Sequence, residues 1–202
     1  YYTFGVFERI LLNNNLKVIN IKLNEINGGS IEVIITKNKD KRKINTNLIK
    51  KIKYDEKKIN KKAFNNFSER IKKVKNDLVS FVNKNQPIIG YGASTKGNIV
   101  LNYCNINSVQ MPYICDANKQ KSRKFTPGTN IKIISKEKMR VLNPKYTLVL
   151  IWSFRSEIIK QELNYIKKGG NLVFHLPKFH IINKKNYKNF VNKDFKNFSY
   201  KY

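Results

Sequence analysis

The spacing of apolar residues divides the chain into a short leading part, a polar middle and a longer α/β part. In the leading part, apolar residues recur at helical spacing over 4–11 and then alternate with polar ones over 16–23. A Gly- and Asn-rich turn at 27–30 precedes the β-branched stretch 31–35. This pattern predicts a helix and two antiparallel strands. Two strands alone are not stable in water, so we expect residues 1–36 to leave an apolar face exposed.

Residues 37–86 begin polar and then recover a helical stripe. The stretch 37–62 is mostly Lys, Asn and Asp, which favours either a solvated linker or a charged helix. Apolar residues then return at helical spacing, at Phe67, Ile71, Val74, Leu78 and Phe81. They predict one long helix over about 60–84, ending before Pro87.

Residues 87–180 alternate short apolar strands with helical stretches. Strands are expected at 87–91, 111–116, 132–134, 146–152 and 171–176, with helices at 96–103 and 156–166. The unbroken apolar run 148–151 is typical of a strand covered on both faces. The rhythm predicts an α/β domain with a Rossmann-like, doubly wound, mostly parallel sheet. The Lys- and Asn-rich tail, 181–202, is expected to form a loosely docked helix.

The composition is that of a folded chain and limits the classes of partner to be expected. Hydrophobic residues make up 41% of the 202 positions, enough for a core, and no apolar run reaches the length of a transmembrane helix. A net charge of +28 is typical of proteins that bind nucleic acids. However, the basic residues are spread along the chain and Arg is rare beside Lys, which favours a compositional bias instead. We therefore expect neither a membrane nor a nucleic-acid partner.

Cysteine and histidine usage excludes several kinds of site. Two cysteines, Cys104 and Cys115, cannot form a disulfide framework or a four-cysteine zinc site. Both lie on apolar stretches and are expected in the core. Neither His175 nor His180 has a spaced ligand partner, so no metal site is expected. Low cysteine content and the absence of a signal-peptide pattern favour the cytoplasm.

The stretch 90–98, GYGASTKGN, carries the clearest chemical signal. It falls where the first strand of the α/β part ends and a helix begins. Glycines allow a sharp turn there, and the free amides of a helix N-terminus attract phosphate. Ser94 and Thr95 can cap the helix, and Lys96 adds a charge. The glycine spacing departs from both the dinucleotide and the P-loop patterns, so a tight turn without a ligand is the alternative.

Four further positions have both a binding and a structural interpretation. Asp116 lies 24 residues beyond Gly92, near where a dinucleotide fold holds a ribose hydroxyl, but a lone Asp after a strand is more often a helix cap or a turn residue. The Thr-Pro-Gly-Thr stretch 126–129 is either a second ligand-facing loop or only a turn. Tyr91 either stacks on a ligand or packs in the core. Trp152 lies at the ligand side of a strand, or packs on the following helix.

Several motifs together resemble one family. The stretches 90–98 with 101–104, 116–119, 125–129, 150–154 and 168–170 occur in the order found in the C-terminal domain of sugar C-methyltransferases. The opening residues resemble the end of that family's central class I methyltransferase domain, so the resemblance covers about 1–177. Two positions depart from it: Asn27 replaces a usual His, and Glu32 replaces a usual basic residue.

The resemblance implies methyl transfer from S-adenosylmethionine to a carbon beside the keto group of a nucleotide-linked deoxysugar. It also implies that the zinc domain, the cofactor loop and a catalytic Glu-His pair precede Tyr1. The chain is then the C-terminal half of an enzyme, contains no catalytic residue, and transfers no methyl group alone. Its expected role is to bind the sugar nucleotide through Tyr91, Gly92, Ser94, Thr95, Lys96, Asn98, Asp116, Thr126, Gly128 and Trp152. The alternatives are an NAD(P)-binding oxidoreductase domain and a basic nucleic-acid-binding module.

Overall fold

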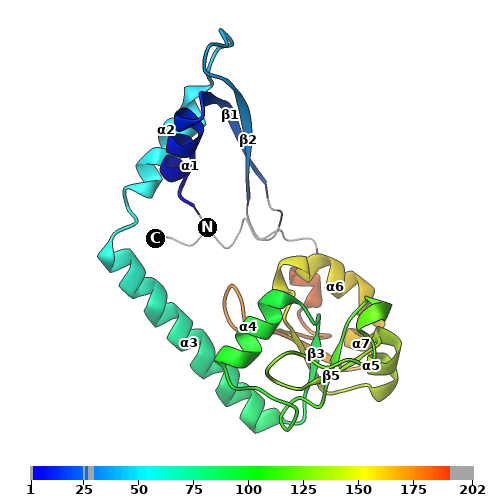
Figure 1. The fold of residues 1–202 in the computed structure, drawn as a ribbon. Coiled ribbons are helices and arrows are strands. Elements are labelled where there is room, and N and C mark those ends of the chain that lie inside the picture. Colours follow the sequence, from blue (N-terminus) through cyan, green and yellow to red (C-terminus); the bar gives the residue numbers. More distant parts are fainter. Residues whose placement is uncertain (1, 25, 27–29, 192–202) are drawn as a thin grey trace. The chain divides into compact units, whose positions relative to one another are not determined.

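The computed structural model describes residues 2–24, 26 and 30–191, in two compact units (Figure 1). The first unit extends to Glu69 and the second begins at Arg70, so the division falls inside the long helix α3 (Lys61–Asn85). This helix matches the predicted one at 60–84. Each unit has its own core and is described separately.

The first unit contains the predicted helix and antiparallel strand pair. Helix α1 (Phe4–Asn13) precedes β1 (Leu16–Asn24) and β2 (Ser30–Lys37), which pair antiparallel from Leu16–Lys37 to Asn24–Ser30. The turn between the strands, including Asn27, lies mostly outside the described residues. Glu32 lies on β2, where its carboxylate is 3.8 Å from the ammonium group of Lys22.

The polar stretch after β2 forms a docked helix rather than a linker. Helix α2 (Thr46–Glu56) places Ile49 in a small core with Phe4, Leu11, Val18 and Ile21. The Glu56 carboxylate accepts hydrogen bonds from the Phe4 and Gly5 amides, where a negative charge stabilises the start of α1. Large apolar side chains nevertheless remain exposed, as the strand-pair pattern predicted, at Ile10, Leu12, Leu23, Ile31 and Ile35.

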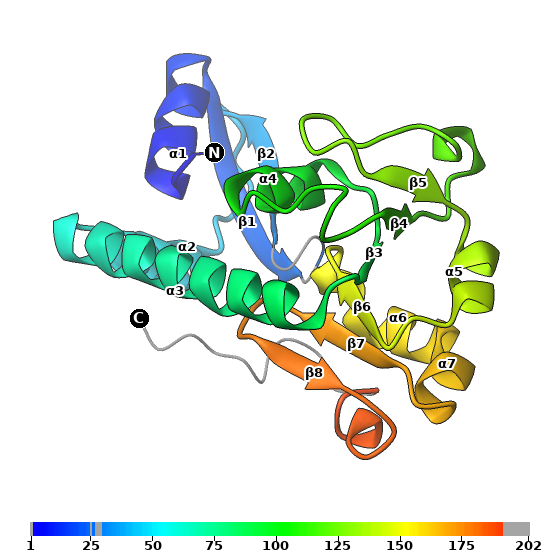
Figure 2. The same cartoon turned by 90° about the horizontal axis from the view of Figure 1, so that it is seen from below.

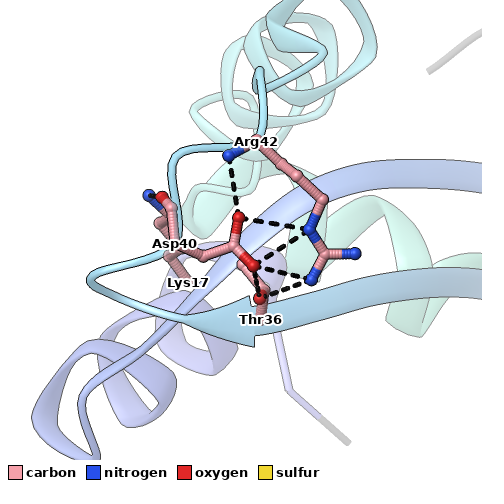
Figure 3. A network of polar contacts seen from close by, with 4 residues as sticks. All are labelled: Lys17, Thr36, Asp40 and Arg42. Atoms are coloured by element: carbon pink, nitrogen blue, oxygen red, sulfur yellow. Dashed lines mark hydrogen bonds and ion pairs between the residues drawn. The ribbon is translucent and has the colours of Figure 1, made fainter.

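A polar network fixes the chain as it leaves β2 (Figure 3). The Asp40 carboxylate accepts hydrogen bonds from the Thr36 hydroxyl and the Arg42 amide, both at 2.7 Å, and pairs with the Arg42 guanidinium at 2.8 Å. The Lys17 ammonium donates to the Asp40 carbonyl at 2.5 Å. The bonds from Arg42 and Thr36 hold the pKa of Asp40 well below its usual range. This closure returns the chain to β1, where the Asn45 amide donates to the Ile19 carbonyl.

The second unit is built around a six-stranded sheet in the order β5-β4-β3-β6-β7-β8 (Figure 2). Its strands are β3 (Ile89–Tyr91), β4 (Tyr113–Cys115), β5 (Lys132–Ile134), β6 (Tyr146–Val149), β7 (Asn171–Phe174) and β8 (His180–Ile182). The first five are parallel, and β8 is antiparallel to β7. In chain order this is the 3-2-1-4-5-6 arrangement of a Rossmann fold, so the α/β prediction is confirmed.

Apolar side chains cover both faces of this sheet. On one face, Leu78 and Val82 of α3 and Leu101 of α4 (Thr95–Tyr103) share a core with strand residues. On the other, residues of α5 (Lys136–Leu142), α6 (Arg155–Gln161) and α7 (Leu163–Lys167) form a second core. Burial on both faces explains the unbroken apolar runs of β6 and β7. Within the described part of the chain, no helix has the length and apolarity needed to cross a membrane.

Two predictions about elements were wrong. The expected helix 156–166 is broken into α6 and α7 at Glu162, whose side chain turns into the core. The expected tail helix is replaced, in its described part, by the edge strand β8 and a short 3-10 turn at Tyr187–Asn189. Residues 192–202 lie outside the described residues. The apolar pair Ile181–Ile182 is enough to extend the sheet, because β7 offers it a free edge.

A buried carboxylate ties the α5, α6 and β3 elements together. Glu162 is 1% exposed and receives two hydrogen bonds from Arg140, at 2.7 and 2.8 Å, and one from the Tyr91 hydroxyl at 2.9 Å. Burial, and then the charge of Glu162, raise the pKa of Tyr91. A buried charge is tolerated only when it is paired in this way.

We predict that Arg140→Met lowers the free energy of unfolding by about 3 kcal/mol, because it leaves the Glu162 carboxylate buried without its cation. Urea unfolding measures the change. Removing all three polar groups, by Arg140→Met, Glu162→Leu and Tyr91→Phe together, should cost less than Arg140→Met alone. The control is Lys73→Met in the exposed Lys73–Asp77 pair, which should change stability by under about 0.5 kcal/mol. Equal effects of Arg140→Met and Lys73→Met would contradict this account.

Candidate functional site at the carboxyl edge of the sheet

The strand order reverses direction at β3, which lies between β4 and β6. In open α/β sheets, ligands bind outside the carboxyl ends of the strands at such a switch point. The segments that follow β3 and β6 are the turn 92–94 and the stretch 150–154. The glycine-rich motif therefore lies at the position where this fold binds ligands.

Glycines bring the turn after β3 against β6. Gly92 has φ +92°, and a Cβ there would lie 2.7 Å from the side chain of Ile151. A Cβ on Gly97, in the first turn of α4, would lie 2.9 Å from the Cβ of Leu150. The Tyr91 carbonyl accepts a hydrogen bond from the Leu150 amide. Only glycine allows both the backbone conformation and this close approach.

Ser94 caps α4 and leaves amides available at its start. Its side-chain oxygen accepts a 3.0 Å hydrogen bond from the Gly97 amide, and its carbonyl accepts one from the Asn98 amide. Among the residues that the structure describes, no group accepts from the amides of Thr95 and Lys96. Ser94 and Asn98 are half-buried, and the side chains of Thr95 and Lys96 are exposed. Free amides, the helix dipole and a lysine together suit an anion.

Asp116 lies beside this turn but is already engaged. One carboxylate oxygen accepts from the Asn118 amide at 2.8 Å, and the other is 3.2 Å from the Lys121 ammonium. Lys121 also donates to the Ala93 carbonyl at 2.9 Å. Nothing in the sequence distinguishes Lys121 from the neighbouring lysines of this Lys-rich segment, so no sequence pattern predicts its contacts.

The Thr-Pro-Gly-Thr turn lies at the other edge of the sheet. It precedes β5, whose first residue, Lys132, pairs with Tyr113 at the start of β4. The Thr126 hydroxyl bonds to that of Thr129 and accepts from the Ile131 amide, and both threonines are buried. Gly128 has φ +77° and packs against Asn102 near the end of α4. The structure thus does not bring Thr126 and Gly128 together with the glycine turn.

The two aromatic candidates differ in placement. Tyr91 is wholly buried on the α6 and α7 face and its hydroxyl donates to Glu162, which favours packing over stacking on a ligand. Trp152 directly follows Ile151 in a 3-10 turn, is half-buried, and packs partly against the second core. Trp152 therefore lies at the carboxyl edge of the sheet, where the sequence predicted it.

The two cysteine thiols and the His175 imidazole are buried. Cys104 and Cys115 lie in the two cores, and burial raises the pKa of Cys115 to about 12, which leaves it unreactive at neutral pH. His175 follows β7 and is 1% exposed. No group of three or more His, Cys, Asp or Glu side chains suited to a metal ion is found among the described residues.

Comparison with known proteins places this geometry in a family. The model of the C-methyltransferase C-terminal domain matches residues 25–177. The chain belongs to this family. The matched residues of this C-methyltransferase C-terminal domain include the glycine turn, the stretch after β6 and all five parallel strands of the sheet.

A curated relative of this C-methyltransferase C-terminal domain is C-methyltransferase NovU from Streptomyces niveus. It is 24% identical over 188 residues, which cover 90% of this chain and 45% of the relative. The chain thus spans less than half the length of that protein.

We predict that Gly92→Ala destabilises this C-methyltransferase C-terminal domain by about 2–4 kcal/mol, because it adds a clash with Ile151 to the strain of a positive φ. The control is Gly169→Ala, since Gly169 has φ +102° with nothing within 4 Å of its Cβ position. It should cost only about 1 kcal/mol. Thermal or urea unfolding measures both. Equal costs would show that the approach to Ile151 is not a constraint.

We also predict acid sensitivity from His175. Burial lowers its pKa from 6.5 to about 4, with the Val149 backbone acting weakly in the opposite direction. The unfolded chain therefore takes up this proton first, and stability falls as the pH drops from about 6.5 to 4, by up to about 3 kcal/mol. Unfolding in urea at several pH values measures the slope. His175→Gln should flatten it, whereas the control His180→Gln should keep most of it. An unchanged slope in His175→Gln would refute the assignment.

Proposed function

We propose that this domain binds a nucleotide-linked keto-deoxysugar and positions it for C-methylation. The observation that carries the proposal is the glycine turn at the β3–β6 switch point, with the free amides of Thr95 and Lys96 at the start of α4. Family membership supports the reaction class, and the resemblance of the motifs supports the sugar-nucleotide substrate. Substrate and activity of the whole enzyme are part of the proposal.

The diphosphate of the substrate is the group that this turn suits best. Its oxygens accept hydrogen bonds from the amides of Thr95 and Lys96, and the positive end of the α4 dipole faces them. The Lys96 ammonium adds a charge-assisted contact. The Ser94 hydroxyl, which accepts from Gly97, still has its own proton to donate. Asn98 and Trp152 border the same edge.

Positioning is the contribution that such a domain makes to catalysis. C-methylation would need a base to remove a proton from the carbon beside a ketone, after which that carbon would take the methyl group from the sulfonium of S-adenosylmethionine, with S-adenosylhomocysteine as the leaving group. S-adenosylmethionine supplies that methyl group, and in this proposal another part of the enzyme holds both the cofactor and the base. Binding the diphosphate rigidly keeps the sugar carbon at reacting distance, which lowers the entropic part of the barrier.

An NAD(P)-binding oxidoreductase domain is the second candidate, because the strand order is that of a dinucleotide fold. Two observations count against it. The turn lacks the dinucleotide glycine spacing, and both oxygens of Asp116, the ribose candidate, already have partners. Titration with NADH beside a sugar nucleotide separates the two functions.

We predict that the chain binds a thymidine-diphosphate deoxysugar and that Lys96→Ala weakens this binding by about 1–3 kcal/mol, through loss of the phosphate contact. Isothermal titration measures it. The control is Lys124→Ala, another exposed lysine, at which we expect no more than a small change. Equal affinities of wild type and Lys96→Ala would remove Lys96 from the site. Binding of NADH in preference to the sugar nucleotide would favour the oxidoreductase function.

A further inference from the structure

We propose that Lys121 is a positioning residue, which fixes the anion-binding turn by linking Asp116 to the backbone at Ala93. The inference rests on the proposed function, since it concerns the same turn. It also gives Asp116 a different role from the ribose contact considered for it: Asp116 orients Lys121.

The bridge joins three points of the carboxyl edge. The Lys121 ammonium is 2.9 Å from the Ala93 carbonyl oxygen and 3.2 Å from a carboxylate oxygen of Asp116. Asp116 directly follows β4, and its side chain is only 13% exposed. Its other oxygen is held by the Asn118 amide. Lys121 therefore connects the loop after β4 to the turn after β3.

This contact fixes one particular peptide unit. The Ala93 carbonyl and the Ser94 amide belong to the same planar group. Lys121 holds the carbonyl, and the Gly92 carbonyl accepts from the Ser94 amide at 2.8 Å. A peptide unit held at both ends cannot rotate without breaking both bonds. The next two amides, those of Thr95 and Lys96, are the ones offered to the diphosphate, so their direction depends on this unit.

Positioning and simple charge attraction predict opposite effects for Asp116. If Lys121 acted only as a positive charge, the nearby carboxylate would weaken its attraction for an anion, and Asp116→Asn would strengthen binding. If Lys121 acts by holding Ala93, Asp116→Asn removes the charged group that orients it, and binding weakens. A ribose role for Asp116 makes a third prediction, because inorganic pyrophosphate has no ribose and would bind Asp116→Asn normally.

The experiment is isothermal titration of the full chain with inorganic pyrophosphate and with thymidine diphosphate, at one fixed ionic strength. Lys121→Met should weaken pyrophosphate binding about tenfold, because it removes the charge-assisted hydrogen bond from Lys121 to the Ala93 carbonyl that holds the turn. Asp116→Asn should weaken both ligands, by about threefold or more. Lys121→Arg, which keeps the charge and the donors, should recover part of the loss. The matched control, Lys124→Met in the same segment, should stay within about twofold of wild type.

Four results would overturn the inference. Equal losses in Lys121→Met and Lys124→Met would mean that only overall charge matters. Tighter pyrophosphate binding by Asp116→Asn would make Lys121 a simple charge. If Asp116→Asn weakens the binding of thymidine diphosphate and leaves that of pyrophosphate unchanged, Asp116 contacts the ribose instead of orienting Lys121. Failure of the wild-type chain to bind either ligand would reject the proposed function itself, and it is distinguished from the other three by being seen without any substitution. If Lys121→Met fails to fold, Asp116→Asn still decides between positioning, charge and ribose contact.

Discussion

The close approach of the β3–α4 turn to β6 is the constraint on which the second unit depends. Gly92 and Gly97 lie where side chains would strike Ile151 and Leu150. This contact places the start of α4 at the switch point of the sheet and lets α4 pack its buried residues on the face shared with α3. A single steric requirement therefore sets the helix packing and also exposes the amides that suit an anion.

The polar groups at the carboxyl edge and at the amino edge of the sheet differ in whether they bond to one another. At the carboxyl edge, the amides of Thr95 and Lys96 have no acceptor among the described residues, and the Lys121 ammonium lies 2.9 Å from the neighbouring Ala93 carbonyl. At the amino edge, the hydroxyl groups of Thr126 and Thr129 bond to each other, and Asn102 bonds to the carbonyl of Pro127. Polar groups that satisfy one another stabilise a turn, whereas groups left open near a charge can bind a ligand.

Much of the fold could be predicted because its apolar periods are clear. The parallel strands and the long helix α3 follow from runs such as 148–151 and from the stripe through Leu78. The break at Glu162 could not be predicted, because it depends on Arg140 and Tyr91, which are distant in sequence. The strand β8 was missed because two apolar residues in a polar tail are too few to show a period.

The candidate site could be predicted only in part, for a related reason. The glycine turn is visible in the sequence because backbone conformation restricts the residue type there. Lys121 is not visible, because its role depends on reaching Ala93, which is 28 residues away. Likewise, spacing could not separate the positions at the carboxyl edge from Thr126 and Gly128, since it does not say at which edge of the sheet a turn lies.

The central claim is that a diphosphate binds at the carboxyl edge, on the first turn of α4. The most direct measurement is amide chemical-shift mapping of the nitrogen-15-labelled chain during titration with thymidine diphosphate. The account predicts that the largest shifts occur at Thr95, Lys96 and their neighbours in the turn, with small shifts at 126–129. Shifts centred on the 126–129 turn, or scattered among the lysines without a maximum at α4, would contradict it.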